Sequence, residues 1–504
     1  MNAQSSTAHI ARTMQTRKRI KWQEINWNAA ETYVNRLQVR IVKAVQSGKW
    51  RLVKRLQKLV TNSFYAKALA VIRVITNKEK KTPGIDGEIW LSNEDKTKAM
   101  YELDTHTYHA KPLKRVYIEK YGKKEKRPLG IPTMHDRAMQ GLQLLSLEPI
   151  AETIADKISF GFRKYRSAQD AMEYMFKLLS RKVSPQWILE GDIKGCFDHI
   201  SHKWLLDNVV ADKRIMKQFL KSGYMDRRTL FPTNEGSPQG GLTSPTYANL
   251  TLDGMETLLL SKYSVSSTGY IHPNYNKHKV HLCRYADDFI ITADNRETLL
   301  EIQSMVEKFM AERGLRLSEE KTVITNINDG FDFLGWNFRK FKGKLLIRPS
   351  AKSKKKITKE LSQTVKYYHE AKQELLIVKL NQITKGWANY HHCVCAKDTF
   401  SLIDHRLWEM LWKWAKRRHP QKSNKWIKKR YWHRKGSRQW SFRTEKVTLF
   451  QMMDTPIVRI KALELKRNPY LDAGYFKRRR KAHRSDQKAA YASSAAALSE
   501  YYAL

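Results

Sequence analysis

The chain has 504 residues, too many for one hydrophobic core, and its 41% of hydrophobic residues excludes wholesale disorder. Its 94 Lys and Arg outnumber 49 Asp and Glu, and the resulting formal charge of +45 calls for a polyanionic partner. Four cysteines without C-x-x-C spacing exclude a disulfide framework, and the lack of a long apolar stretch or signal-peptide core excludes a membrane protein. We therefore expect several folding units, reduced thiols and a nucleic-acid partner inside the cell.

The first part of the chain is predicted to contain a basic arm, a helical extension and a hairpin. Residues 1 to 23 are basic and lack acids, which is typical of a flexible arm and is shared by organelle transit peptides. From 27 to 75 apolar residues recur at helical spacing, up to a breaker-rich turn at 82 to 87. Two β-like runs, 116 to 118 and 129 to 131, flank a polar stretch and predict a basic hairpin.

Helices and strands alternate in the middle of the chain. The apolar patterns predict helices over 135–157, 167–181, 245–262 and 296–313, and strands over 186–192, 280–283 and 289–292. This mixed order indicates an α+β domain built on an antiparallel sheet. Beyond Pro349 the pattern predicts helices rich in Lys, Arg and Trp up to 434, whereas 489 to 504 is expected to be a loosely held tail.

Acidic residues stand at the ends of these strands. The tetrad YADD (285–288) separates two β-like runs, and Asp192 ends a third. A bare Asp-Asp pair is more often a polar turn than a site, because Asp favours turns. With Asp192 at a neighbouring strand end, however, three carboxylates converge in this interpretation. Magnesium takes oxygen ligands, and two such ions about 3.5–4 Å apart clamp the attacking and leaving oxygens of a phosphoryl transfer.

Three motifs occur in the order of reverse transcriptase palm motifs: DIKGCFD (192–198), SPQGG (237–241) and YADD (285–288). Together they resemble a group II intron reverse transcriptase. The resemblance runs from about residue 27 to 480, and it is supported by RPLGIP (127–132), GFR (161–163), RSA (166–168) and FLGW (333–336). It implies a right-hand polymerase of the α+β class, with an N-terminal helical extension and an α-helical thumb.

The resemblance also implies roles for individual residues. Asp192, Asp287 and Asp288 would be the catalytic acids and would bind two Mg²⁺ ions. For the nucleotide pocket it implies Lys120, Arg127, Phe197 and Gln239. Phe197 would exclude a ribose 2′-hydroxyl, its alternative being a core residue. Arg127 and Lys120 would grip the triphosphate, although a hairpin one residue longer than usual weakens the match of Lys120.

The basic helical region resembles the thumb, or maturase, domain of the same family, which implies a bound intron RNA. Between 411 and 440 twelve cations occur without one acid, and aromatic residues are interleaved with them. Cations bind phosphates, whereas aromatic residues either fill a core or stack on unpaired bases. We expect about half of the tryptophans to be core. The candidate RNA-binding residues are Lys413, Arg417, Arg418, Lys425, Lys428, Lys429 and Arg430.

Four domains are predicted along the chain. They are an N-terminal helical extension (1–82), reverse transcriptase fingers and palm (83–345), a thumb or maturase domain (346–440) and a basic C-terminal region (441–504), interpreted as a DNA-binding remnant with a flexible tail. Many family members end in a His-Asn-His nuclease. No such pattern follows Arg438, so we expect a nuclease-lacking or truncated chain.

The resulting hypothesis is an RNA-directed DNA polymerase and intron maturase in the bacterial cytoplasm, associated with the nucleoid; organellar import is the less favoured location. Its expected partners are a group II intron RNA, an RNA template with a DNA primer, target DNA and deoxynucleoside triphosphates, without a membrane. Two alternatives stay open: a domesticated reverse transcriptase in antiphage defence, and a non-catalytic cofactor that only folds RNA for splicing. The YADD tetrad and Asp192 argue against the second.

Overall fold

In the computed structural model, which describes residues 19–119, 126–435 and 438–501, the chain forms two compact units that alternate along the sequence. Unit 1 comprises 1–155, 193–254 and 308–316, and unit 2 comprises 156–192, 255–307 and 317–504. The expected arm falls largely on residues 1–18, outside the described part. No helix among the described residues is long and apolar enough to cross a membrane.

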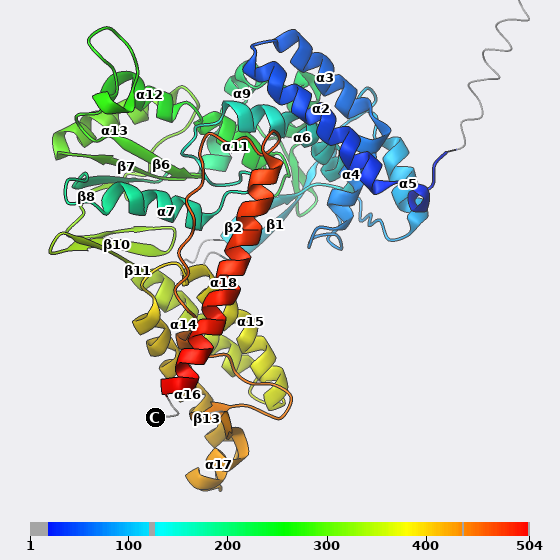
Figure 1. Ribbon diagram of the computed structural model, residues 1–504. Helices are drawn as coiled ribbons and strands as arrows, with labels where there is room; N and C mark the ends of the chain where they lie inside the picture. Colours follow the sequence, from blue (N-terminus) through cyan, green and yellow to red (C-terminus); the bar gives the residue numbers. More distant parts are fainter. Residues whose placement is uncertain (1–18, 120–125, 436–437, 502–504) are drawn as a thin grey trace, which may run out of the picture. The chain divides into compact units, whose positions relative to one another are not determined.

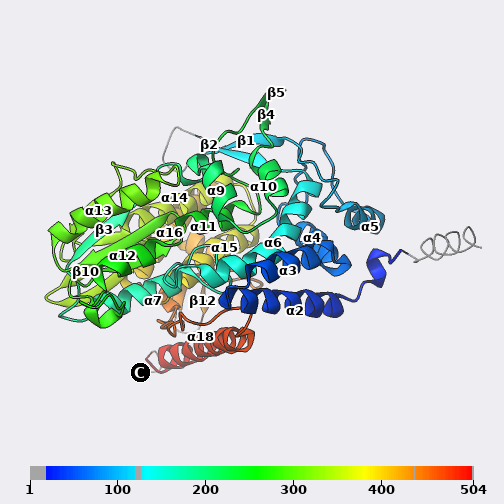
Figure 2. The same ribbon diagram turned by 90° about the horizontal axis from the view of Figure 1, so that it is seen from above.

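Unit 1 is a helical core beside a small sheet. Helices α2 (Trp27–Gln46), α3 (Trp50–Asn62), α4 (Phe64–Ile75) and α6 (Met134–Ile154) lie side by side (Figures 1 and 2). On α2, the buried residues Val34, Leu37, Ile41 and Val45 recur at helical spacing and face this core, as expected. The other helices are η1 (Trp22–Glu24), α5 (Asn93–Glu102), α8 (Cys196–His199), α9 (His202–Asn208), α10 (Lys213–Leu220) and α11 (Ser244–Leu252).

The sheet of unit 1 contains the predicted hairpin. Strand β1 (Leu113–Glu119) pairs antiparallel with β2 (Lys126–Ile131) and parallel with β4 (Tyr224–Asp226), which pairs with β5 (Thr229–Phe231). Gly130 of β2 lies against Leu113 of β1, where an added Cβ would meet a side-chain carbon at 2.9 Å. The hairpin is therefore confirmed, while its turn at 120–125 lies outside the described residues.

Unit 2 contains the antiparallel sheet that we call the palm sheet, with strand order β6-β7-β3-β8. Its strands are β3 (Trp187–Gly191), β6 (His281–Tyr285), β7 (Asp288–Ala293) and β8 (Val323–Asn326). Helices α7 (Ala168–Leu179), α12 (Met255–Tyr263), η2 (Pro273–Tyr275) and α13 (Arg296–Ala311) accompany it, the end of α13 belonging to unit 1. Strands β6 and β7 are buried along most of their length, which agrees with the apolar run Phe289–Ile291 in β7.

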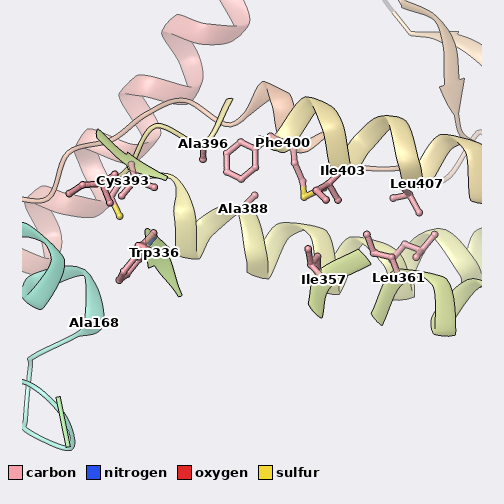
Figure 3. Packing of buried hydrophobic residues seen from close by; sticks show 14 of the residues in the cluster. Ala168, Trp336, Ile357, Leu361, Ala388, Cys393, Ala396, Phe400, Ile403 and Leu407 are labelled. Carbon is pink, nitrogen blue, oxygen red and sulfur yellow. The ribbon is translucent and has the colours of Figure 1, made fainter. Parts of the chain in front are cut away.

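A second sheet, β9 (Phe331–Phe333), β10 (Trp336–Phe341) and β11 (Lys344–Pro349), leads into three long helices that we call the thumb bundle. These are α14 (Ala351–Tyr367), α15 (Gln373–His391) and α16 (Lys397–Arg418). Figure 3 shows how Ile357 and Leu361 of α14 and Phe400, Ile403 and Leu407 of α16 pack in this core. The predicted α+β class is thus confirmed.

The C-terminal part differs from the expectation. Helix α17 (Asn424–Tyr431) is followed by a hairpin, β12 (Trp432–Lys435) and β13 (Arg438–Phe442), then by η3 (Met452–Asp454) and helix α18 (Ala473–Tyr501). The segment expected to be a loose tail is thus helical up to Tyr501. Arg479 of α18 forms an ion pair with the buried Asp170 at the start of α7 and also donates to the carbonyl of Lys461. This pair fixes α18 within unit 2.

Candidate active site

The three predicted acids meet at one end of the palm sheet. Strand β3 pairs with β7 so that Gly191 lies opposite Phe289, and extending this register by one residue sets Asp192 opposite Asp288. Directly opposed residues in an antiparallel pair have Cβ atoms about 4.5–5.5 Å apart. Asp287 belongs to the turn joining β6 to β7, where Tyr285 pairs with Asp288. The pattern of strand ends therefore brings all three carboxylates to the same edge.

The charges of these acids act on one another. The pKa of Asp288 is raised to about 6, first because neighbouring protein atoms desolvate its carboxyl, and then because Asp287 and Asp192 repel its charge. Lys321 and Lys352 partly offset this repulsion. Asp288 is nevertheless an exposed residue, so its carboxyl remains open to a ligand from solvent. Such a group of crowded carboxylates favours binding a cation.

Asp192 is held by residues that follow α13. The ammonium of Lys321 donates to a carboxylate oxygen of Asp192 at 2.6 Å, and the backbone N–H of Ser318 donates to the Asp192 carbonyl at 2.8 Å. The Asp192 side chain is mostly buried, whereas Lys321 is about half exposed. Lys321 therefore supplies a positive charge at the position where the carboxylates need one.

A close backbone approach supports the YADD turn. Ala286 has φ 59°, in the left-handed region, and the strand before it pairs with residues 158 to 160. The N–H of Phe160 donates to the carbonyl of Arg284 at 2.8 Å, and the N–H of Arg284 donates to Ile158 at 3.1 Å. A Cβ added to Gly161 would lie 2.4 Å from the Ala286 nitrogen. Only glycine leaves room for this approach.

The donor atoms suit a hard cation, although a finished metal site is not formed. Among the residues that the structure describes, no three His, Cys, Asp or Glu side chains are arranged to hold a metal ion. Carboxylate oxygens are nevertheless the ligands that Mg²⁺ prefers, and Lys321 already places one cationic group against Asp192. The residues at this edge therefore fit a divalent cation by their chemistry.

Two of the predicted nucleotide-pocket residues meet in unit 1. Phe197 and Gln239 line the same pocket of about 240 Å³. The N–H of Ser237 donates to the carbonyl of Phe197 at 2.7 Å, and the N–H of Gly130 donates to the carbonyl of Gln239 at 2.8 Å. Phe197 is half-buried and lines this pocket, so it is not fully enclosed in a core. Gly240 makes this approach possible, because its Cβ would lie 2.5 Å from the Gly130 carbonyl oxygen.

The structure does not place Arg127 or Lys120, the two residues predicted to bind the triphosphate, in this pocket. Arg127 is exposed on β2, next to Pro128, which lines the pocket, but Arg127 does not line it. Lys120 lies outside the described residues. The role of Arg127 thus stays a prediction.

The candidate RNA-binding residues fall into two groups in unit 2. Three of them line the pocket of about 810 Å³ beside α14 and α16, and the other four are on α17. All are exposed except Lys428, whose ammonium lies 4.4 Å from the centre of the Trp440 ring. Trp414 and Trp432 are buried, whereas Trp426 and Trp440 are exposed, so only part of the tryptophans is core.

The sequence interpretation missed the residues that support the acids. Lys321, Lys352 and Gly161 touch or influence the aspartates and their turn, but none was singled out for this role. In a chain so rich in lysine, no pattern distinguishes Lys321 from a solvated cation. Because 129 residues separate Lys321 from Asp192 in the sequence, only the fold reveals that their side chains are in contact.

Comparisons with known families match most of this architecture. Residues 118–338 match the family described as reverse transcriptase (RNA-dependent DNA polymerase). Residues 22–103 match the N-terminal domain of reverse transcriptase, and residues 354–432 match the group II intron, maturase-specific domain. A reverse transcriptase domain implies a divalent metal cation as cofactor.

Several curated proteins are similar to this chain. The group II intron-encoded protein LtrA of Lactococcus lactis subsp. cremoris is 32% identical over 329 residues, covering 54% of this chain and 54% of LtrA. Protein YkfC of Escherichia coli K12 is 30% identical over 321 residues, covering 56% of this chain and 82% of YkfC. Maturase-like protein 1 of Euglena gracilis is 23% identical, covering 73% and 77%. The matched part of this chain thus spans about half the length of LtrA.

Proposed function

Because this chain belongs to the family of group II intron-encoded reverse transcriptases, we propose that it is an RNA-directed DNA polymerase and intron maturase. It would copy an RNA template from a DNA primer with deoxynucleoside triphosphates. It would also bind a structured group II intron RNA, assist its splicing and act with target DNA during retromobility.

One observation carries the polymerase activity: the palm sheet sets Asp192 opposite Asp288, with Asp287 in the adjoining turn. We assign two Mg²⁺ ions to these carboxylates. The ions would stabilise the attacking and leaving oxygens as the primer 3′-hydroxyl attacks the α-phosphate and pyrophosphate leaves. Lys321 and Ser318 orient Asp192, and Gly161 allows the turn that positions Asp287.

The nucleotide pocket would be formed around Phe197 and Gln239. The half-buried Phe197 ring supports a role in excluding the ribose 2′-hydroxyl, and Gln239 would contact the incoming nucleotide. Arg127 would bind the triphosphate bidentately from β2.

The maturase role rests on the match of the thumb region to the maturase-specific domain and on its uncompensated cations. An intron RNA supplies the phosphates that these cations need. Sequencing of the RNA that co-purifies with the protein tests this assignment. Enrichment of an intron flanking the gene supports it, whereas enrichment of unrelated small RNAs favours the antiphage alternative.

The polymerase assignment is tested by primer extension on an annealed RNA template. Asp287→Asn keeps the shape of the side chain but weakens a metal ligand, so we expect extension to fall by about 10³-fold or more. Asp329→Asn, at an exposed turn after β8, is the matched control and should extend primers normally. Extension by Asp287→Asn at the rate of the control would remove the three-aspartate site.

A further inference from the structure

The largest pocket described above lies in the thumb bundle, beside the end of α14 and the end of α16. Its volume of about 810 Å³ is in the range of pockets that hold small-molecule-sized groups, about 300–1,000 Å³. Trp414, Met410 and Val365 contribute its apolar wall, Trp414 and Val365 being buried. The Trp414 indole N–H donates to the carbonyl of Tyr368 at 3.1 Å, so the ring is fixed. The half-buried Met410 therefore supplies the accessible part of this wall, and the fixed Trp414 ring lies behind it.

A fixed guanidinium borders this wall. Arg418 lies 4.7 Å from the centre of the Trp414 ring, and it donates to the carbonyls of His369 at 2.8 Å and Ala371 at 3.2 Å. These bonds hold the guanidinium plane in one orientation. Nucleobases stack on arginine planes as well as on aromatic rings. Arg418 thus offers a second flat surface at the same pocket.

The rim of the pocket is cationic. Lys366, Lys413 and Arg417 are exposed and line it, whereas Glu370 is the one acid among the lining residues. Glu370 lies 3.2 Å from His369 and is highly exposed. The pocket therefore combines an apolar wall with several anion-binding groups, which is the complement of a nucleobase joined to phosphates.

We propose that this pocket binds an unpaired nucleotide of the RNA, with its base against Met410 and Arg418, which Trp414 supports from behind, and its phosphates on Lys366, Lys413 and Arg417. A paired base stays within its helix and cannot enter, so the site selects single-stranded or bulged positions. The inference rests on the proposed function and identifies the kind of RNA element that the thumb bundle recognises.

Crosslinking locates the base directly. The probe is a ten-nucleotide oligouridylate with one central 4-thiouridine, bound to the full-length protein, irradiated and mapped by peptide mass spectrometry. We expect crosslinks in the peptides that contain Met410 to Arg418 or Ser362 to Glu370. Crosslinks confined to other peptides would overturn the proposal.

The affinity for the oligouridylate can also be measured after a bulky side chain is introduced into the pocket. Ser362→Trp adds bulk at a half-buried lining position, and Gln363→Trp adds the same bulk at an exposed position that does not line the pocket. Stacking of one base contributes about 1–3 kcal/mol, or about 5- to 150-fold, to binding. Ser362→Trp should therefore weaken binding of the oligouridylate by about 5-fold or more, but leave binding of an abasic decamer of equal charge unchanged. Gln363→Trp should bind both as the wild type does.

A second variant guards against misfolding. Met410→Gln keeps nearly the same volume and makes the wall polar, so it should show the same selective loss. If both pocket variants keep the wild-type preference for the base-bearing decamer, the pocket does not hold a base. Primer extension by the wild type on a short template is measured in parallel. Its absence would count against the proposed polymerase, whereas intact extension without pocket crosslinks would overturn this inference alone.

Discussion

At the acidic end of the palm sheet, Asp192 and Asp288 face each other across paired strands, and Lys321 offsets part of their repulsion. Like charges directly opposite on a sheet are destabilising. The site therefore stores an unfavourable interaction that a bound cation would relieve. This arrangement exchanges some stability of the metal-free protein for metal affinity.

Asp288→Asn tests this exchange through the dependence of stability on pH. The pKa of folded Asp288 is about 6, above the ordinary 3.8, so the folded state binds this proton more tightly than the unfolded state. The free energy of unfolding therefore falls as the pH rises from about 4 to about 6 and stays lower above that range. In metal-free buffer at neutral pH, we expect Asp288→Asn to melt roughly 1–3 °C above the wild type, a small gain because the carboxyl is exposed.

The comparison at about pH 4 is the control, because wild-type Asp288 is then protonated and the two proteins should melt alike. Melting is followed by circular dichroism with a chelator present. Equal midpoints at both pH values would show that the three carboxylates do not repel one another in solution.

Phe197→Val tests the ring that lines the unit 1 pocket. The smaller side chain removes bulk where a ribose 2′-hydroxyl would lie, so discrimination against ribonucleotides should fall by roughly 10- to 100-fold, equivalent to about 1.4–2.8 kcal/mol. Incorporation of ribo- and deoxynucleotides is compared under single-turnover conditions. Phe219→Val, at a buried ring in the helical core of unit 1, is the control for a mere loss of packing. Unchanged discrimination in Phe197→Val would identify Phe197 as a packing residue.

The individual acids could be predicted from the sequence because they stand at the ends of apolar runs that predict strands and lie in motifs that resemble a known family. Lys321 and Gly161 could not be predicted, because their roles depend on which distant segments the fold brings together. Phe197 shows the intermediate case. Its motif indicated a pocket or a core, and only its half-buried ring beside Gln239 favours the pocket.

Among the elements, α17 concentrates charge most clearly. Lys425, Lys429 and Arg430 are exposed on it, and Ser423 caps its first turn by accepting from the N–H of Trp426. Its helix macrodipole also favours cations in the last turn, where Lys428, Lys429 and Arg430 stand. A solvated face and an RNA-binding face both agree with this arrangement.

Salt dependence separates these two interpretations. The change is Lys425, Lys428, Lys429 and Arg430 to Gln together, with binding to a structured intron RNA measured from low to moderate salt. Each phosphate contact contributes about 0.7 to 0.9 to the slope of log K against log salt, so the variant should bind more weakly and with a visibly shallower slope. Extension on a short annealed template should largely survive.

The control for this variant keeps the charge, exchanging the three lysines for Arg and Arg430 for Lys. It should retain the wild-type slope. If the Gln variant does so too, the cations of α17 are a solvated face and the RNA lies elsewhere.

Elements with strong periodicity were predicted well, including α6, α7 and the strands β3, β6 and β7 of the palm sheet, whereas β8 was not predicted. The helix expected over 245–262 is instead two helices, α11 and α12, because Asp253 and Gly254 interrupt it, with Gly254 at φ 102°. The hairpin β12–β13 was missed because its strands are short and rich in basic residues. Helix α18 was not predicted, because a loose tail was expected in its place and its attachment depends on the distant Asp170.

For the whole molecule, the charge of +45 is the dominant feature. Self-repulsion destabilises a compact chain and is screened by salt, so the melting midpoint should rise between about 0.05 M and 0.5 M NaCl. At fixed low salt, heparin should raise it further, because a polyanion that binds only the folded state stabilises it. Uncharged dextran of similar size is the control. A midpoint that is insensitive to salt and heparin would show that the charge is already compensated within the protein.

The division into units could not be predicted from the order of the chain. Predicted domains were continuous, whereas each compact unit is assembled from three separated segments. Long-range strand pairing, such as β3 with both β7 and β8, creates this interleaving. Periodicity reports local structure, and it carries no information about which segments close a unit.

Gly161 shows how contact between distant segments of the chain determines which positions tolerate substitution. It carries no functional group, yet every replacement would drive a side chain into the backbone of the YADD turn. In a library that samples all substitutions at every position, residue 161 should therefore be as intolerant as the acids themselves, although it binds neither metal nor nucleotide. Replacement by alanine, the mildest change elsewhere, would be among the harmful ones here. Positions without a functional group, such as residue 161, would thus be constrained as strongly as the residues that bind metal or substrate.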